Sequence, residues 1–245
     1  MKPEIRIFTL PEIMADSLAE EFYRYASTAF QTRQKLFVAL SGGSTPLLFF
    51  TRMGEFNQQR KNKIEWKKIH FFWGDERCVP PDNADSNYGS AKSVLFEQIE
   101  IPEKNIYRIR GEEDPAKEVI RYCDLLKASV PMQRNVPIFD WIFLGVGDDG
   151  HTASIFPDQM KLLASDEVCA VAKHPETGQS RITLTGRVIN SARRITFMAT
   201  GSSKSQIVSQ IINNEPEAKK YPAAKIKPEY GILDWYLDSE AADDI

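Results

Sequence analysis

Residues 36–46 read Leu-Phe-Val-Ala-Leu-Ser-Gly-Gly-Ser-Thr-Pro, and this stretch decides the fold class. Its first five residues form a continuous apolar run, which is typical of a strand buried on both faces of a parallel sheet. The glycines that follow let the backbone turn sharply, and Pro46 suits the first position of a helix. We therefore expect a strand at 36–40 that passes through a tight turn into a helix, with Thr45 as its N-cap.

The same alternation of short apolar runs and longer amphipathic stretches continues on both sides of this segment. Further strands are predicted at 5–9, 69–73, 141–146, 168–172, 195–200 and 232–236, and helices at 11–31, 46–53, 87–98, 115–128 and 203–212. This order favours an α/β fold of three layers, in which a mostly parallel sheet carries helices on both faces. The runs at 36–40 and 141–146 are apolar throughout and would be the central strands.

Length, charge and hydropathy narrow the class of protein. A chain of 245 residues suits one α/β domain, so we predict a single domain over 1–245. The 31 basic and 34 acidic side chains nearly balance, which argues against an electrostatic nucleic-acid binder. The apolar runs are too short to cross a membrane and the N-terminus has no signal-peptide pattern, so we expect a cytoplasmic protein without a membrane partner.

The three cysteines do not form a recognisable framework. Cys78, Cys123 and Cys169 are odd in number, far apart and without CxxC spacing. This pattern predicts buried thiols in a reducing compartment, with neither a disulfide framework nor a zinc site.

Ligands of open parallel sheets bind beyond the carboxyl ends of the strands, and four segments at such positions are unusual. The first is 41–46, where Gly42, Gly43, Ser44 and Thr45 would present free N–H groups at a helix N-terminus. Such a ring of donors binds phosphate or a developing oxyanion. The alternative is an ordinary turn between a strand and a helix.

The second segment is Gly-Asp-Glu-Arg at 74–77, directly after the strand 69–73. Arg77 offers a planar fork that suits phosphate, and Asp75 could orient that fork or accept hydrogen bonds from sugar hydroxyls. A surface ion pair between the two side chains is the alternative.

The third segment is Gly-Val-Gly-Asp-Asp-Gly-His at 145–151, after the second apolar strand. His151 is a candidate general base because imidazole changes its charge near neutral pH. Asp148 or Asp149 could hold its ring in the useful tautomer, and the residues do not decide between them. A purely structural histidine is the alternative, and no second histidine or cysteine has the spacing of a metal ligand.

The fourth segment is a pair of basic signals that lie further along the chain. Arg181 opens the run Arg-Ile-Thr-Leu-Thr, and Lys204 ends Gly-Ser-Ser-Lys after the strand 195–200. Lys204 could add a point charge to an anion that backbone donors already hold. A solvated side chain is the alternative for any single lysine.

Together these segments identify a family. SGGSTP, FFWGDERCVPPDNADSNY, DWIFLGVGDDGHTASIFP, RITLT, TGSSK and YPAAKIKP occur in the order and approximate spacing of 6-phosphogluconolactonases. The resemblance runs from about residue 36 to the C-terminus. It implies the modified Rossmann-like fold of the superfamily that also contains glucosamine-6-phosphate deaminases and ribose-5-phosphate isomerases.

The resemblance also implies a reaction and a set of site residues. The reaction is hydrolysis of 6-phospho-D-glucono-1,5-lactone to 6-phosphogluconate in the oxidative pentose phosphate pathway, and it needs neither a cofactor nor a metal. His151 matches the family's base, with Asp149 and Asp75 as further candidate catalytic residues. Arg77, Arg181 and Lys204, with the loop 42–45, match positions that bind the sugar phosphate. The expected partner is this small substrate, and the expected assembly is a monomer or weak dimer.

Two other functions stay open at this point. An amino-sugar-phosphate deaminase or isomerase would share the phosphate loop, but such enzymes usually continue from the histidine into Ala-Phe-Asn-Glu. This chain reads Ala-Ser-Ile-Phe-Pro at 153–157 and lacks that glutamate. A non-catalytic sugar-phosphate sensor would keep Arg77 and Lys204 but would typically lose the base.

Overall fold

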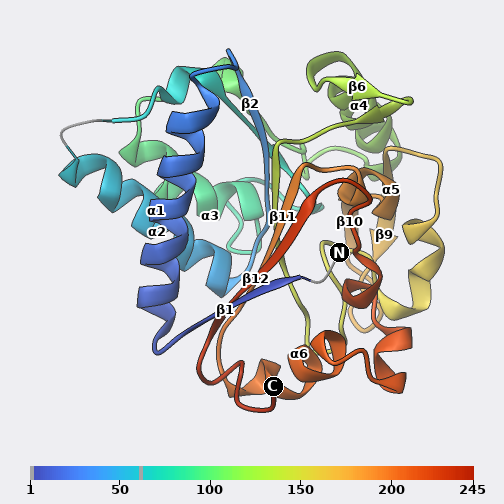
Figure 1. Cartoon of the computed structure of the whole chain (residues 1–245). Helices are drawn as coiled ribbons and strands as arrows, with labels where there is room; N and C mark the ends of the chain where they lie inside the picture. Colours follow the sequence, from blue (N-terminus) through green and yellow to red (C-terminus); the bar gives the residue numbers. More distant parts are fainter. Residues whose placement is uncertain (1–2, 61–62) are drawn as a thin grey trace.

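A computed structural model describes residues 3–60 and 63–245, and a seven-stranded sheet runs through its middle (Figure 1). Its strands are, in spatial order, β1 (Glu4–Phe8), β12 (Ile232–Asp238), β11 (Arg194–Ala199), β8 (Trp141–Gly145), β2 (Leu36–Leu40), β3 (Ile69–Trp73) and β5 (Ile106–Tyr107). Each neighbouring pair is parallel. The carboxyl ends of all these strands therefore lie at one edge of the sheet.

Helices lie on both faces of this sheet, which confirms the predicted three-layer α/β fold (Figure 1). One face carries α1 (Pro11–Ala29), α2 (Ser44–Gln59) and α3 (Asn87–Val94). The other side holds α4 (Pro115–Ser129), α5 (Gly186–Asn190) and α6 (Ser205–Ile212). Short 3₁₀ turns occupy Trp66–Lys68, Phe96–Gln98, Glu103–Asn105, Pro157–Leu163, Ser202–Lys204, Pro216–Lys220 and Ala223–Lys225.

A second, antiparallel sheet shares the side of α4, α5 and α6. It consists of β4 (Asp75–Arg77), β10 (Ser180–Leu184) and β9 (Cys169–Lys173), with β10 in the middle. The strand predicted at 168–172 therefore belongs to this small sheet and not to the parallel one. A hairpin of β6 (Met132–Gln133) and β7 (Val136–Pro137) forms a third sheet.

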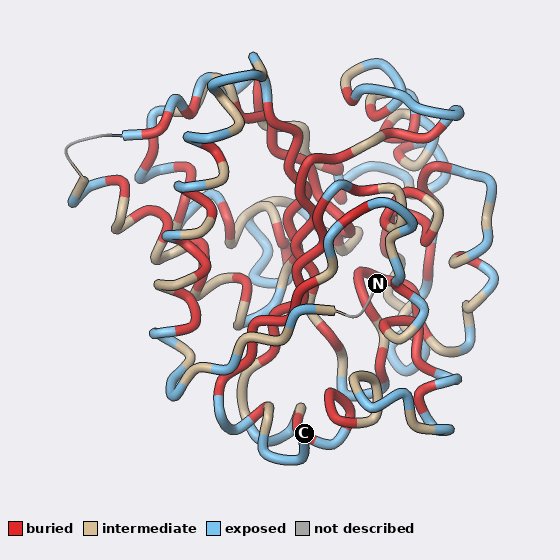
Figure 2. The backbone as a smooth tube through the Cα atoms, in the orientation of Figure 1, coloured by how far each residue is buried: buried red, intermediate tan, exposed pale blue. Residues whose placement is uncertain are grey.

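The two strands predicted to be central are central. β8 is the fourth of the seven strands and β2 the fifth, and all five residues of β2 are buried. In Figure 2 the buried backbone gathers along the strands of this sheet. Continuous apolar sequence and double-sided burial thus coincide, as expected for parallel strands under two layers.

The start of α2 differs from the prediction. Gly43 is the N-cap, with φ at 105°, and the helix begins at Ser44. The assignments of Thr45 as N-cap and of Pro46 as first helical residue are therefore wrong. Pro46 still lies within the first turn, where a missing N–H leaves no hydrogen bond unmade.

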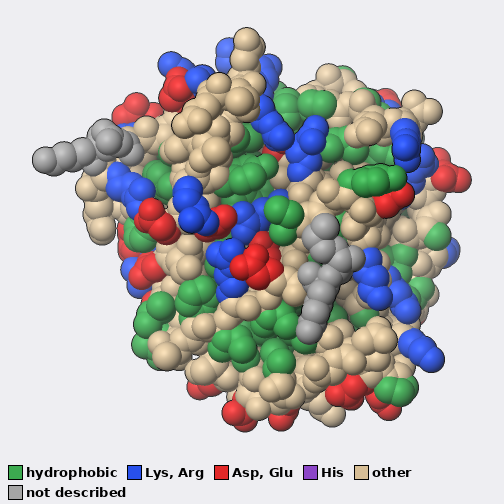
Figure 3. All heavy atoms as spheres, in the orientation of Figure 1, with side chains coloured by type: hydrophobic (Ala, Val, Ile, Leu, Met, Phe, Trp, Pro, Cys, Tyr) green, Lys and Arg blue, Asp and Glu red, His purple; other side chains and the backbone are tan. Residues whose placement is uncertain are grey.

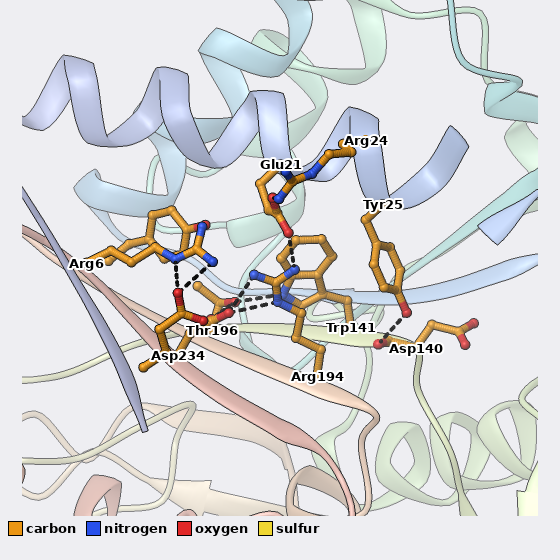
Figure 4. A network of polar contacts seen from close by, with 11 residues as sticks. Arg6, Glu21, Arg24, Tyr25, Asp140, Trp141, Arg194, Thr196 and Asp234 are labelled. Carbon is orange, nitrogen blue, oxygen red and sulfur yellow. Dashed lines mark hydrogen bonds and ion pairs between the residues drawn. The ribbon is translucent and has the colours of Figure 1, made fainter. Parts of the chain in front are cut away.

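A buried polar network joins the sheet to α1 (Figure 4). Arg194 of β11 donates from Nε to Asp234 Oδ2 at 2.8 Å and from Nη1 to Glu21 Oε1 at 2.7 Å. Its guanidinium carbon lies 4.0 Å from the centre of the Trp141 ring, and Trp141 Nε1 donates to Thr196 Oγ1 at 2.8 Å. Because every charge here has a hydrogen-bonded partner, the network fixes α1 against three neighbouring strands.

The cysteines differ in part from the prediction. Cys123 of α4 and Cys169 of β9 form a disulfide, so the expectation of free thiols is wrong for this pair. Cys78 is a free, half-buried thiol, and burial raises its pKa to about 11. It is therefore not a reactive thiolate at neutral pH.

Acidic and basic side chains are interspersed on the face of the molecule in Figure 3. Arg52 lies between two carboxylates, 3.2 Å from Asp16 and 2.7 Å from Glu55. Within 3–60 and 63–245, no helix is both long and apolar enough to cross a membrane.

Candidate active site

A cavity of about 220 Å³ opens at the carboxyl edge of the parallel sheet, beyond the neighbouring strands β11, β8, β2 and β3. Nine of the predicted site residues line it, namely Gly42, Gly43, Ser44, Thr45, Asp75, Arg77, His151, Arg181 and Lys204. The tenth, Asp149, contacts His151. Segments far apart in the sequence therefore meet because their strands are neighbours in the sheet.

The loop between β2 and α2 needs glycine for two different reasons. A Cβ at Gly42 would overlap the side chain of Asn87, and the positive φ of Gly43 disfavours any residue with a Cβ. The Ser41 hydroxyl donates to the Phe143 carbonyl at 2.6 Å, which ties the loop to β8. The residues at the N-terminus of α2 line the cavity, and the free N–H groups of a first helical turn are donors suited to an anion.

Arg77 and Arg181 lie directly opposite each other on β4 and β10. The Nε atoms of both are buried and have no hydrogen-bond partner within the part of the chain that the structure describes. Nor does either guanidinium lie within ion-pair distance of a described carboxylate. Two adjacent cations without an ion-paired carboxylate favour the binding of an anion between them.

The protonation of Arg181 reflects this crowding. Its burial lowers the pKa of its guanidinium; the nearby charge of Asp75 raises it, and the charge of Arg77 lowers it again. The net direction is downward. An anion in the cavity would restore the missing negative charge.

Asp75 is buried beside these arginines. Its Oδ2 accepts from the Ser154 hydroxyl at 2.6 Å, and its backbone carbonyl accepts from Asn87 Nδ2 at 2.9 Å. The first contact joins β4 to the segment that follows His151. Asp75 therefore holds two walls of the cavity together.

His151 and Asp149 form a hydrogen-bonded pair. Asp149 Oδ1 lies 2.6 Å from His151 Nδ1 and also accepts from the His151 N–H at 3.0 Å. Partial burial opposes ionisation of Asp149, but the hydrogen bonds and charge of His151 outweigh it, and the pKa of this carboxyl lies below its ordinary value. A Cβ at Gly147 would collide with both side chains. Among the described residues, none is a hydrogen-bond partner of His151 Nε2.

Asp148 points to a different partner. Its carboxylate forms an ion pair with Lys204 Nζ. The structure thus separates the two aspartates that the sequence left open: Asp149 contacts the imidazole, and Asp148 contacts the lysine. Lys204 itself lies in the turn Ser202–Lys204 that leads from β11 into α6.

Three residues of the site were not singled out in the sequence. Asn87 lines the cavity, Ser154 binds Asp75, and Phe156 packs against His151 with 4.8 Å between ring centres. Asn87 belongs to the motif that ends at Tyr88, and Ser154 and Phe156 belong to the motif that follows His151. Both motifs were recognised, but the order of residues does not show which side chains turn toward the cavity. No group of three potential metal ligands occurs within 3–60 and 63–245.

Both the sequence and the fold are similar to those of known proteins. A family model described as glucosamine-6-phosphate isomerases/6-phosphogluconolactonase matches residues 10–235. The 6-phosphogluconolactonase of Haemophilus influenzae is 43% identical over 234 residues, which cover 96% of each chain. The structure of 6-phosphogluconolactonase from Trypanosoma brucei superposes with a TM-score of 0.84 at 29% identity, covering 100% of this chain and 99% of that one. A monomeric glucosamine-6-phosphate deaminase shares the fold, with a TM-score of 0.81 at 18% identity over 99% and 100% of the two chains.

Proposed function

Because the chain belongs to the glucosamine-6-phosphate isomerase/6-phosphogluconolactonase family, its activity is hydrolysis of 6-phospho-D-glucono-1,5-lactone, and we propose that His151 activates the attacking water. The observation that carries this mechanism is the pair of His151 and Asp149 at the cavity wall. Asp149 accepts a hydrogen bond from the proton on Nδ1, so the lone pair of the neutral ring is on Nε2. That nitrogen is the base.

The reaction follows from these positions. His151 Nε2 removes a proton from water as the water oxygen bonds to the lactone carbonyl carbon. The tetrahedral oxyanion then collapses, the bond to the ring oxygen breaks, and the imidazolium returns the proton to that oxygen as it becomes a hydroxyl. The product is 6-phosphogluconate. A lactone is an activated ester, so positioning, a base and oxyanion donors are sufficient for catalysis.

The phosphate of the substrate binds, in this proposal, to the positive part of the cavity. Arg77 and Arg181 supply forks that suit phosphate oxygens, Lys204 supplies a mobile point charge, and the N-terminus of α2 supplies backbone donors. The unpartnered Nε atoms of the two arginines support this assignment. Binding at the phosphate end places the carbonyl beside His151.

The test is hydrolysis of freshly made lactone, measured above its spontaneous opening. General-base catalysis contributes about 10² to 10⁴ in rate, so His151→Ala should lower kcat by that factor while KM changes far less. In a plot of kcat against pH, the fall on the acid side (the acid limb) should vanish in the same variant.

The control is His70→Asn, which removes an imidazole at the amino end of β3, away from the cavity. It should keep both kcat and the acid limb. A folded His151→Ala protein with near-normal kcat would refute the base. Release of ammonia from glucosamine 6-phosphate would instead favour the deaminase reaction.

A further inference from the structure

Phe156 is a buried ring that contacts both functional ends of the cavity. It has no exposed surface, and its ring centre lies 4.8 Å from that of His151. The guanidinium carbon of Arg181 lies 5.6 Å from the same ring. His174 packs edge-on from another direction, at 5.3 Å. Phe156 is not among the residues that line the cavity, so it would act through its neighbours.

A tight turn brings Phe156 back to His151, which lies only five residues earlier. In this turn the N–H of Ile155 donates to the Thr152 carbonyl at 2.9 Å, and Ala153 has a positive φ of 48°. A left-handed alanine is unfavourable by itself and persists only where its surroundings hold it. Here the Thr152 hydroxyl donates to the Gly145 carbonyl at 2.9 Å, and Ser154 bonds to Asp75.

Neither neighbour of Phe156 is fully fixed by its hydrogen bonds. Arg181 has a buried Nε without a partner among the described residues, and no described carboxylate forms an ion pair with it. His151 is bonded to Asp149 through Nδ1, while its Nε2 has no hydrogen-bond partner among the described residues. Both side chains are in contact with the Phe156 ring.

We propose that Phe156 is a positioning residue that aligns the base and the phosphate-binding arginine at the same time. This inference rests on the proposed roles of His151 and Arg181. The flat ring restricts the imidazole on one side and supports the guanidinium through a cation–π contact. Loss of the ring therefore has two effects that can be measured separately. The kcat at saturating substrate shows whether His151 is aligned, and the affinity for 6-phosphogluconate shows whether Arg181 is aligned.

The experiment compares Phe156→Leu and Phe156→Met with Phe156→Tyr, which keeps the ring. In the Leu and Met variants the dissociation constant for 6-phosphogluconate should rise on the order of 3- to 30-fold, the value of a partly desolvated cation–π contact. Their kcat should fall by roughly tenfold or more, because a displaced base is no longer aligned with the water. Phe156→Tyr should restore most of both quantities.

A matched control separates positioning from general loss of core packing. Phe71 is equally buried, lies in β3 and does not line the cavity. Phe71→Leu should lower the thermal midpoint while kcat and product affinity stay within a factor of two. If Phe156→Leu and Phe156→Met behaved like Phe71→Leu, Phe156 would be an ordinary core residue and the proposal would be wrong.

A double variant tests the contact with Arg181 directly. Because both substitutions remove the same arginine contribution, Arg181→Ala with Phe156→Leu should bind 6-phosphogluconate no more weakly than Arg181→Ala alone. Additive losses would overturn the proposal. If instead His151 is not the base, the His151→Ala variant with intact Phe156 should show a near-normal kcat, which distinguishes that outcome from a failure of the Phe156 proposal.

Discussion

Arg77 and Arg181 face each other across β4 and β10, and no described carboxylate lies within ion-pair distance of either one. Such a pair destabilises the empty protein and favours the protein with a bound anion. Arg181→Gln should therefore unfold at the same or a slightly higher temperature than the wild type when no ligand is present. The stabilisation by 6-phosphogluconate should shrink, and kcat/KM should fall about 10- to 150-fold, the value of one charge-assisted contact.

Thermal unfolding with and without 6-phosphogluconate checks both halves of this prediction. Arg187→Gln is a suitable control, because that arginine pairs with Asp166 away from the cavity. Undiminished stabilisation of Arg181→Gln by the ligand would remove Arg181 from the phosphate site.

The two consecutive aspartates should differ in their effects on catalysis. Asp149→Asn replaces the carboxylate that accepts from His151 Nδ1 with an amide that can also donate, so the ring loses its fixed tautomer. The kcat should therefore fall roughly 10- to 1,000-fold. Asp148→Asn frees Lys204 and should change mainly KM. Steady-state kinetics of the two variants side by side decide this point. Equal losses of kcat would contradict the assignment.

For individual side chains, the sequence predicted which residues meet in the cavity but not which of them form hydrogen bonds or ion pairs with each other. His151, Arg77 and Lys204 could be identified because polar residues after buried parallel strands must converge. The choice between Asp148 and Asp149 depended on which carboxylate turns toward the imidazole, and neighbouring loop residues give no periodic signal for that. Phe156 was missed for the same reason.

Among the elements, β2 and β3 were predicted with the bounds that the structure has, whereas α2 was not. The prediction ended this helix at Met53, before Gly54, but the helix continues to Gln59. A Cβ at Gly54 would lie 2.8 Å from the Val94 carbonyl at the end of α3. The glycine is thus required by a neighbouring helix and does not mark an end, which only the packed structure reveals.

The small antiparallel sheet was missed for a different reason. β4 is three residues long, and β10 contains Arg181, whose charge obscures the apolar pattern. β4 is defined by its pairing with β10, and β10 by its pairing with both β4 and β9, rather than by their own sequences. Short strands of this kind carry too few residues for a periodic signal.

The start of β3 gives the fold a dependence on pH. Burial lowers the pKa of His70 to about 4, and the charges of Lys35 and Lys104 add to this effect. The ring also stacks on Phe37 and its Nδ1 lies 3.0 Å from the Tyr107 hydroxyl. Between pH 6.5 and 4 the unfolded chain binds a proton at His70 that the folded chain does not. The stability that the neutral, buried His70 contributes is therefore complete above pH 6.5 and is lost as the pH falls toward 4.

His70→Phe should remove this dependence. From pH 7 to pH 4.5 the wild type should lose on the order of 2 kcal/mol more of its unfolding free energy than the variant does. Urea unfolding at several pH values measures the difference. Parallel curves for the two proteins would show that His70 is protonated equally in both states.

Across the whole molecule, the network around Arg194 ties α1 to the middle of the sheet (Figure 4). Burial raises the pKa of Asp234, and the charge of Arg194 opposes this. Arg194→Met would leave that carboxyl buried without its cation, at a cost of about 3–5 kcal/mol. Arg194→Met with Asp234→Leu should recover part of the loss, because no lone charge remains.

Denaturant midpoints of the single and double variants test this coupling, and kcat should survive in both at low temperature. A single variant as stable as the wild type would mean that Asp234 is satisfied without Arg194.

The three-layer architecture was predictable from the order of strands and helices alone. That the chain forms one domain remains our proposal.

The pairing of β1 with β12 has a consequence for synthesis on the ribosome. Arg6 of β1 donates to the Tyr236 hydroxyl of β12, 230 residues away, and among the described residues β12 is the one strand that pairs with β1. At about 5–20 residues per second, β12 leaves the ribosome roughly 10 to 45 seconds after β1. Throughout this interval β1 lacks its partner strand in the sheet. Folding of the other strands can begin earlier, but the sheet is completed only after β12 has left the ribosome.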